Sequence, residues 1–247
     1  MKTKKIISAG PLVLEAIYPR GSAHDSPRIR AGKRRLSSEA QQRMNLKYSY
    51  QKLELMLAAN FMPGDLIVTL TYDDAHAPAS RAEADRRLKK FRADLSRRRA
   101  RRGARLVMVW ATENVFGAGR WHHHCVINAS GADFEEIRRC WPGGSNVEIE
   151  KLRIDRDHSY ECIARYMCKE ARERPGLRSW SYTRSCRHPE VESFPVPDDT
   201  PLQPPKGATI YEEATERNDY GSFRWVKYLA PDWRRRKRPY SPRRRKR

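Results

Sequence analysis

One short stretch of the chain, Glu113 to Asn128 (ENVFGAGRWHHHCVIN), most constrains its fold and its chemistry. The second half of this stretch has the composition of a β-strand, and successive side chains of a strand point to opposite faces. His122 and His124 therefore share one face, and His123 lies on the other. Two imidazoles one pleat apart can bind one divalent ion. Glu113, just before a Gly-rich turn that can return the chain as a hairpin, can supply a third ligand.

The charge of the chain indicates the kind of partner it binds. Lys and Arg number 51 among 247 residues, against 30 Asp and Glu, so the formal net charge is +21. A positive field of this size concentrates polyanions, and counterion release makes nucleic acid the expected ligand. An anionic membrane surface is the alternative, but the sequence has no long basic amphipathic helix with a bulky apolar face.

The N-terminus and the cysteines argue against export. The first residues resemble a signal peptide, but the longest uncharged stretch, Ile6 to Leu14, is interrupted by Ser8, Gly10 and Pro11. We therefore expect neither export nor a membrane span. The five cysteines form no CxxC pair and are typical of reduced cytosolic thiols. The expected location is the cytoplasm.

Hydrophobic periodicity and capping signals predict a mixed order of helices and strands. The expected elements are a helix over 38–60, a strand over 66–72, a helix beginning at Ser80, a strand over 106–113, the histidine strand, a short helix capped by Asp133, a strand over 147–154 and a helix over 159–174. This order contains a hairpin and has no regular βαβ repeat. It predicts an α+β fold with an antiparallel sheet.

The ends of the chain are expected to differ from its centre. We predict a basic N-terminal arm over 1–36 that is extended apart from one short strand, a folded domain over 37–190, a Pro-rich C-terminal extension over 191–233, and a disordered basic tail over 234–247. The tail holds ten Lys or Arg in fourteen residues. The predicted helix after Ser80 is followed through Arg105 by a similar concentration of positive charge, which suits a phosphate backbone.

A second candidate reactive group lies in the predicted helix over 159–174. An apolar face of this helix gathers Tyr160, Ile163, Ala164, Met167 and Ala171. Cys162, Tyr166 and Lys169 fall on roughly the opposite side. Positive charge from Lys169 and from the adjacent Arg165 favours the phenolate form of Tyr166. A phenolate near a divalent cation can attack phosphorus.

Three segments resemble, in order and spacing, the HUH endonucleases, and most closely the rolling-circle replication initiator (Rep) proteins of phages and bacterial plasmids. The segments are VTLTY at Val68 to Tyr72, the glutamate and GRWHHH of the histidine hairpin, and IARYMCKEA at Ile163 to Ala171. The resemblance covers residues 37–190. It implies a ferredoxin-like HUH endonuclease fold, with a central antiparallel sheet of about five strands flanked by helices.

The resemblance also implies roles for individual residues. His122 and His124 match the metal-binding pair, Glu113 the additional ligand, Tyr166 the nucleophile and Lys169 the lysine one turn later. The implied reaction nicks single-stranded or extruded origin DNA with Mg²⁺ or Mn²⁺, and leaves a 5′-phosphotyrosine and a free 3′ hydroxyl. The implied partners are a single-stranded origin or hairpin, a host helicase and a host DNA polymerase, in the cytoplasm of a bacterial cell.

Two positions depart from the family pattern. The residue between the paired histidines is normally bulky and hydrophobic, and here it is His123, which we assign to packing or to a DNA contact. Members with two tyrosines carry the second one a helical turn before the first, and here that residue is Cys162. A mechanism that alternates between two tyrosines is therefore in doubt.

Basic residues near the predicted motifs are candidate DNA contacts. They are Arg86, Arg87, Arg97, Arg98, Arg120, Arg165, Arg184 and Arg187. Two alternatives remain open at this point: an HUH-type transposase or relaxase, and a non-catalytic basic DNA-binding protein. Relaxases of the usual kind carry the tyrosine before the histidines, and here it follows them.

Overall fold

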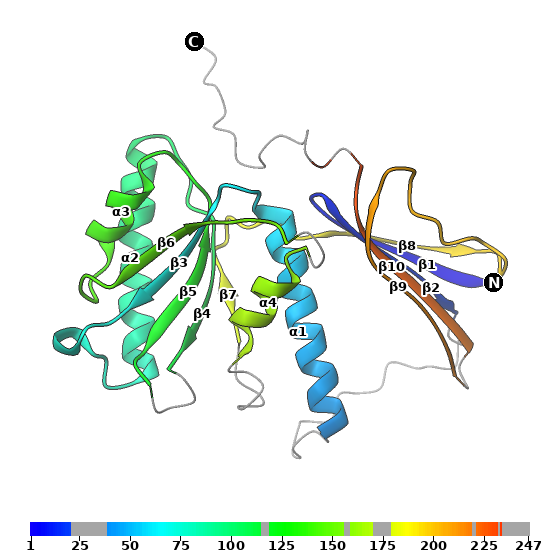
Figure 1. Ribbon diagram of the computed structural model, residues 1–247, viewed down its shortest axis with the longest axis horizontal. Helices are drawn as coiled ribbons and strands as arrows, with labels where there is room; N and C mark the ends of the chain where they lie inside the picture. The colour runs from blue at the N-terminus through cyan, green and yellow to red at the C-terminus, as the bar shows by residue number, and fades with distance from the viewer. Residues whose placement is uncertain are drawn as a thin grey trace, which may run out of the picture. The chain divides into compact units, whose positions relative to one another are not determined.

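The protein forms two compact units, each built on its own antiparallel sheet (Figure 1). The computed structural model describes residues 1–20, 39–114, 119–155, 159–169, 179–218, 221–231 and 233. The larger unit comprises the described residues of 46–187, and the other comprises those of 1–45 and 188–236. The α+β class with an antiparallel sheet, predicted from the order of elements, is confirmed.

The larger unit contains the sheet that carries the histidine strand. Its strands are β3 (Leu66–Thr71), β4 (Met108–Glu113), β5 (His122–Ile127), β6 (Val147–Lys151) and β7 (Ser181–Tyr182). They lie in the order β6-β3-β5-β4-β7, and every pair is antiparallel. The strand β5 is therefore central, which shields the histidines on both sides.

Helices cover both faces of this sheet. They are α1 (Glu39–Asn60), most of which belongs to this unit, α2 (Arg81–Arg101), α3 (Asp133–Cys140) and α4 (Glu161–Met167), and a 3-10 turn, η1 (Asp74–His76), precedes α2. Figure 1 shows α2 and α3 on one face and α4 on the other. The buried residues of β3, Leu66, Val68 and Leu70, point to the face covered by α2.

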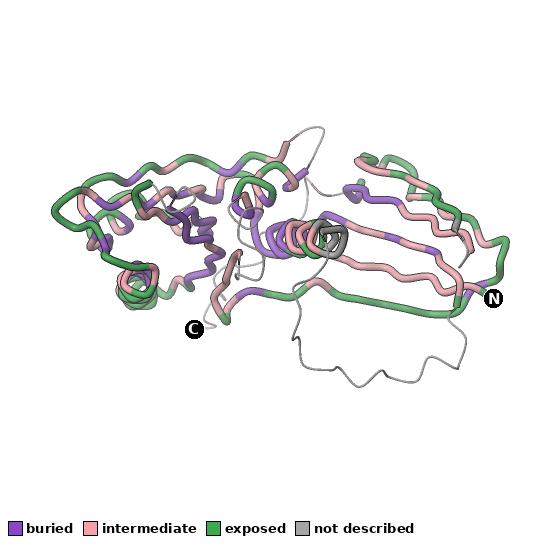
Figure 2. Tube along the Cα trace, turned by 90° about the horizontal axis from the view of Figure 1, so that it is seen from below, coloured by how far each residue is buried: buried purple, intermediate pink, exposed green. Residues whose placement is uncertain are grey.

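The helix α2 follows its sequence signals closely. Ser80 is the N-cap, and its side chain accepts a hydrogen bond from the backbone N–H of Glu83 at 3.3 Å. Leu88, Phe91 and Leu95 are buried in the same core as the sheet residues. The side of α2 that faces away from the sheet is exposed (Figure 2) and carries most of its arginines.

The smaller unit differs from the predicted arm and extension. Its strands are β1 (Lys2–Ala9), β2 (Leu12–Pro19), β8 (Glu190–Val196), β9 (Thr209–Asn218) and β10 (Gly221–Leu229), in the order β8-β1-β2-β10-β9. Residues 2–19 thus form a hairpin inside a sheet, with Gly10 and Pro11 as its two-residue turn. Gly10 has φ 57°, which suits glycine. The Gly-Pro pair that interrupts the apolar stretch turns the chain, and the strands continue on either side.

Several sequence predictions lie outside the described residues. They are the basic cluster and the capping serine within 21–38, the turn residues within 115–118, the end of the tyrosine helix within 170–178 and the basic tail over 234–247. The division of the chain at residues 36, 190 and 233 stays a prediction. Among the helices that the structure describes, none has the length and apolar character of a membrane span.

A buried ion pair ties α2 to the loop before α3. Arg99 is fully buried, and its guanidinium donates to Asp133 Oδ1 at 2.6 Å and to Asn128 Oδ1 at 2.7 Å. Asp133 accepts two further bonds, from the backbone N–H groups of Ser130 and Gly131. The carboxylate thus organises the loop preceding α3, where the sequence had predicted a helix cap, and α3 shows no side-chain cap bond.

Replacing Arg99 by alanine should destabilise the protein by about 3–5 kcal/mol, because the buried Asp133 carboxylate would lose its cationic partner. Urea unfolding followed by circular dichroism measures this loss. Arg98→Ala removes an exposed neighbour on the same helix and should change the unfolding free energy by less than about 0.5 kcal/mol. Equal losses in the two variants would contradict the role given to the ion pair.

Candidate active site

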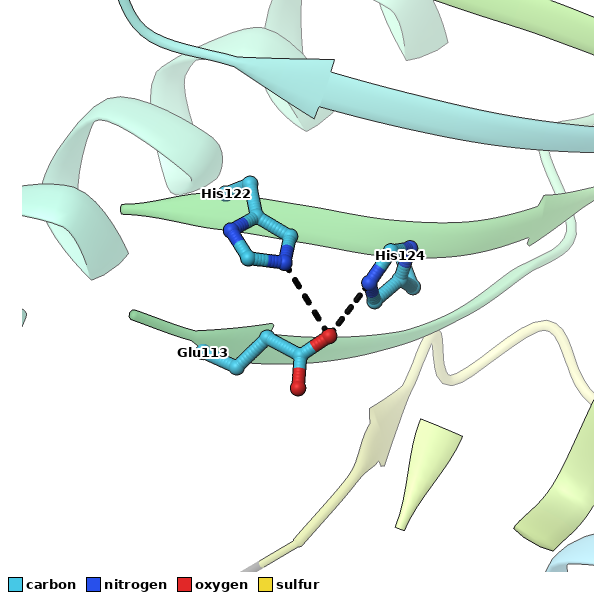
Figure 3. A group of neighbouring side chains, drawn as sticks. All are labelled: Glu113, His122 and His124. Atoms are coloured by element: carbon cyan, nitrogen blue, oxygen red, sulfur yellow. Dashed lines mark hydrogen bonds and ion pairs between the residues drawn. The ribbon is translucent and has the colours of Figure 1, made fainter. Parts of the chain in front are cut away.

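Three potential metal ligands meet where β4 and β5 pair. The strand register places Glu113 directly opposite His122, and Ala111 opposite His124. All three ligand side chains therefore lie on the face of the sheet away from α2, and their ligand atoms lie within 4.8 Å of one another. Figure 3 shows both imidazoles directed at the same carboxylate oxygen. The small side chain of Ala111 leaves room beside His124.

The orientation of His122 is fixed by a backbone carbonyl. Its Nδ1 lies 2.9 Å from the carbonyl oxygen of Arg120, which can only accept a hydrogen bond, so Nδ1 carries the proton. Its Nε2 lies 3.1 Å from Glu113 Oε1. This nitrogen can face a carboxylate in two ways: as the N–H of an imidazolium, or as a lone pair with a cation between them. A backbone acceptor on the second nitrogen is the usual support of a metal-binding histidine.

His124 is held from the neighbouring strand β3. Its Nδ1 lies 3.3 Å from the hydroxyl of Thr69, its cross-strand neighbour. Its Nε2 contacts Glu113 Oε1 but, among the described residues, makes no hydrogen bond, although it is buried. The two imidazole rings are nearly perpendicular, at 82°, with centroids 4.8 Å apart. A buried nitrogen that faces a carboxylate without a hydrogen bond fits a metal ligand.

The charges of this cluster favour a bound cation. Burial would raise the pKa of Glu113, but polar contacts with His122, His124 and Lys169 outweigh it and hold that pKa well below its usual range. Burial acts to lower the pKa of His122, and the hydrogen bond to Glu113 raises it overall. For His124, burial prevails and lowers the pKa. The cluster thus offers a carboxylate and two imidazoles, a donor set that can hold a divalent metal.

The structure brings Tyr166 and Lys169 to the same cluster. The ring of Tyr166 lies 4.6 Å from that of His124, between centroids, and is 51% exposed. Lys169 Nζ lies 2.9 Å from Glu113 Oε1 and 4.1 Å from the centroid of the Tyr166 ring. One ammonium group therefore contacts both the carboxylate and the tyrosine.

The packing of α4 explains why Tyr166 faces outward. Tyr160 is fully buried, and its hydroxyl donates to the carbonyl of Phe61 at 2.6 Å. Ala164 and Met167 are buried on the same side of the helix. This burial follows the apolar face predicted from the sequence, except that Ala171 lies outside the described residues. With that face anchored, the ring of Tyr166 projects toward the histidines.

His123 belongs to the opposite face of the sheet. It is fully buried, with Nε2 3.0 Å from the Tyr72 hydroxyl and Nδ1 2.9 Å from Thr112 Oγ1. The Thr112 hydroxyl in turn donates to Asp85 Oδ1 at 3.1 Å. Burial lowers the pKa of His123 to about 3, so the ring is neutral. Of the two roles considered for this residue, the structure places it in packing.

The candidate DNA-binding arginines are not gathered at the metal cluster as a group. Four of them pair with carboxylates on their own side of the fold: Arg87 with Glu83, Arg97 with Asp94, Arg120 with Asp74 and Arg165 with Glu161. Arg165 also stacks on Tyr50 of α1, with its guanidinium 4.4 Å from the ring centroid. The side chains of Arg86, Arg98, Arg184 and Arg187 are exposed. Their contacts with DNA stay predictions.

Two supports of the site are not evident from the sequence. Thr69 was considered only as a sheet-filling residue or a DNA contact, and its place beside His124 depends on the register of β3 against β5. The carbonyl of Arg120 orients His122 through the backbone, which no residue pattern signals. The period-two threonines of β3 are the nearest sequence signal for the first of these.

Comparison with known proteins agrees with this geometry. Residues 65–171 match the model of a family described as replication-associated protein ORF2. The matched region runs from β3 through α4 and contains all five residues of the cluster. A search among curated proteins and a search among solved structures found no significant match. The family match and the His-Glu-His cluster together confirm the predicted resemblance to replication initiators of the phage and plasmid type.

Replacing His124 by alanine should weaken Mn²⁺ binding at least tenfold, because one ligand is removed. Titration monitored by electron paramagnetic resonance measures the free ion. Affinity in the wild type should fall as pH drops through the raised pKa of His122, since the proton and the metal compete for Nε2. His188→Ala, which removes an exposed histidine elsewhere, is the control. Equal affinities in the two variants would exclude His124 as a ligand.

Replacing His123 by phenylalanine should reduce the acid sensitivity of the fold. In the unfolded chain this imidazole binds a proton near pH 6.5, whereas in the folded protein it does so only near pH 3, so stability is lost as pH falls between these values. The wild type should therefore lose about 3 kcal/mol more than the variant between pH 6.5 and pH 4. Urea unfolding at both pH values gives the difference, and parallel losses would contradict a neutral His123.

Proposed function

We propose that this protein is a metal-dependent, single-tyrosine DNA nickase and strand transferase that initiates rolling-circle replication. The observation that carries the proposal is the position of Tyr166. Its exposed ring lies against His124, on the same face of the sheet as Glu113 and His122. The match to a replication-associated family supports the process in which the reaction takes part.

The proposed reaction exchanges one phosphodiester bond for another. The phenolic oxygen of Tyr166 attacks phosphorus, a bond to the tyrosine forms, and the bond to the 3′ oxygen breaks. The phenolic proton passes to solvent, to which the ring is open, and the departing 3′ oxygen takes a proton from solvent. Because the phosphotyrosine keeps the energy of the original bond, the strand can later be rejoined without ATP.

Lys169 acts electrostatically in this proposal. Burial would lower its pKa, but the contact with Glu113 raises it above the usual value, so the side chain remains an ammonium and cannot serve as a general base near neutral pH. It lies above the Tyr166 ring. There it stabilises negative charge on the phenolate and on the phosphate that approaches it.

Glu113, His122 and His124 would hold the divalent ion, for which we propose Mg²⁺ or Mn²⁺. When bound, the ion withdraws charge from the non-bridging phosphate oxygens. The DNA substrate is proposed to be a single-stranded or extruded origin, with host helicase and polymerase acting on the exposed strands. Cys162, one helical turn before Tyr166, is exposed and offers no second phenol, which favours a single-tyrosine mechanism.

Replacing Tyr166 by phenylalanine should abolish the covalent protein–DNA adduct and leave DNA binding within about threefold, because only the nucleophilic oxygen is removed. The assay incubates the protein with Mn²⁺ and a labelled single-stranded origin fragment, and resolves the adduct by denaturing electrophoresis and mass spectrometry. The matched control is Tyr48→Phe, which removes a phenol of similar exposure, 50%, from α1. An adduct at wild-type level in the Tyr166 variant would refute the assignment.

The same assay separates the nickase from its alternatives. A protein that only binds DNA would retain the labelled strand and form no adduct with any metal. Nicking that persists in EDTA would contradict the metal role while leaving the tyrosine in question. A transposase or relaxase would form the adduct as well, and would be distinguished by the DNA sequence it cuts.

A further inference from the structure

A pocket lies on the other face of the sheet from the metal cluster, between α2 and the strands β4 and β7. Its volume is about 420 Å³, within the range of roughly 300–1,000 Å³ that is usual for ligand sites. The side chains that matter for its chemistry are Arg81, Asp85, Lys89, Arg92, Trp110 and Trp180. No role in the proposed reaction accounts for this combination of indole rings and cations.

Positive charge in the pocket exceeds negative charge. Three cationic side chains face one carboxylate, Asp85, which pairs with Arg81 at 3.7 Å. The guanidinium of Arg92 lies over the ring of Trp110, 4.1 Å from the centroid. Arg92 Nε is buried and has no hydrogen-bond partner among the described residues. A buried donor of this kind points to an acceptor that a ligand would supply.

Trp180 forms a second aromatic surface of the pocket. Its indole N–H donates to Ser49 Oγ at 3.3 Å, and its ring lies 5.8 Å from the ring of Tyr182, at an interplanar angle of 38°. These contacts hold the indole in place before any ligand arrives. Aromatic rings combined with arginine and lysine are the usual platform for unpaired bases, because every base has a face that stacks.

The open edge of the sheet connects this pocket to the metal cluster. Strand β7 pairs with β4 only at Val109 and Trp110, so among the described strands β4 is unpaired on that side beyond Trp110. Thr112 lines the pocket, and the next residue, Glu113, belongs to the metal cluster on the opposite face. A flexible single strand can pass from one face to the other across this edge.

We propose that the pocket binds an unpaired base of single-stranded DNA, stacked on the indoles, with a neighbouring phosphate held by the cations. The proposal rests on the proposed function for one point, that the strand bound here is the strand cut at Tyr166. A base within a duplex is already stacked and cannot enter such a pocket without being extruded. Single-stranded DNA is therefore the ligand that the geometry favours.

Photocrosslinking tests the proposal directly. The full-length Tyr166→Phe protein is irradiated with a single-stranded oligothymidylate that carries 5-bromouracil, and the crosslinked peptides are identified by mass spectrometry. We expect crosslinks at Trp110 or Trp180. Crosslinks confined to other peptides would overturn the proposal.

Affinity measurements provide a second test. In fluorescence anisotropy, Trp180→Ala should bind the oligothymidylate about tenfold more weakly, while Trp180→Phe, which keeps an aromatic ring, should lose much less. Lys89→Ala should also reduce the salt dependence by about one counterion. The control is Tyr48→Ala, an exposed ring on α1. Unchanged affinity in both Trp180 variants, or thymidine monophosphate binding as tightly as the oligonucleotide, would overturn the proposal.

The outcomes separate this site from the nicking reaction. A Tyr166-dependent adduct in the wild type, without crosslinks at the indoles, would reject the pocket and leave the proposed function standing. Crosslinks at the indoles without an adduct in the wild type would reject the nickase and support the pocket.

Discussion

The pairing of β4 with β5 in one register sets Glu113 opposite His122 and Ala111 opposite His124. A shift of one residue would turn the carboxylate toward α2 and away from the imidazoles, because strand side chains alternate. The register is held by burial on the α2 side, where Cys125 and Ile127 join the core. The core on one face of the sheet thus determines the chemistry on the other.

Lys169 connects the metal cluster to the tyrosine. Its ammonium compensates Glu113 and lies over the Tyr166 ring at the same time. The carboxylate oxygen that it contacts is the one that both imidazoles face. Lys169 therefore shares that oxygen with any ion the ligands hold, and its remaining donors stay directed toward the tyrosine. The position of α4 and the charge balance of the cluster depend on each other.

Much of the larger unit could be predicted from the sequence. The alternation of the histidine strand assigned His122 and His124 to one face and His123 to the other, and the apolar stripe of α4 indicated that Tyr166 faces away from the core. These patterns are local, so a single segment contains them. Thr69 and the Arg120 carbonyl depend on contacts between strands, and no local pattern specifies such contacts.

The smaller unit was predicted least well, for the same reason. Its N-terminal hairpin is rich in lysine and turns at Gly10 and Pro11, which resemble interruptions when only neighbouring residues are considered. The strands that flank it in the sheet, β8 and β10, come from the other end of the chain. The five-stranded arrangement of the larger unit agreed with the predicted fold, whereas a second sheet was not expected.

The pairing of β1 with β8 joins Lys2 to Val196, and that of β2 with β10 joins Leu12 to Leu229. A ribosome releases the N-terminal hairpin first and its partner strands last, so the hairpin must wait while the whole sheet of the larger unit is synthesised. Sheets closed by such distant segments form slowly, because the entropy of a long loop is lost before the contacts form. The reactive half of the protein can thus be assembled while both edges of the hairpin are still unpaired.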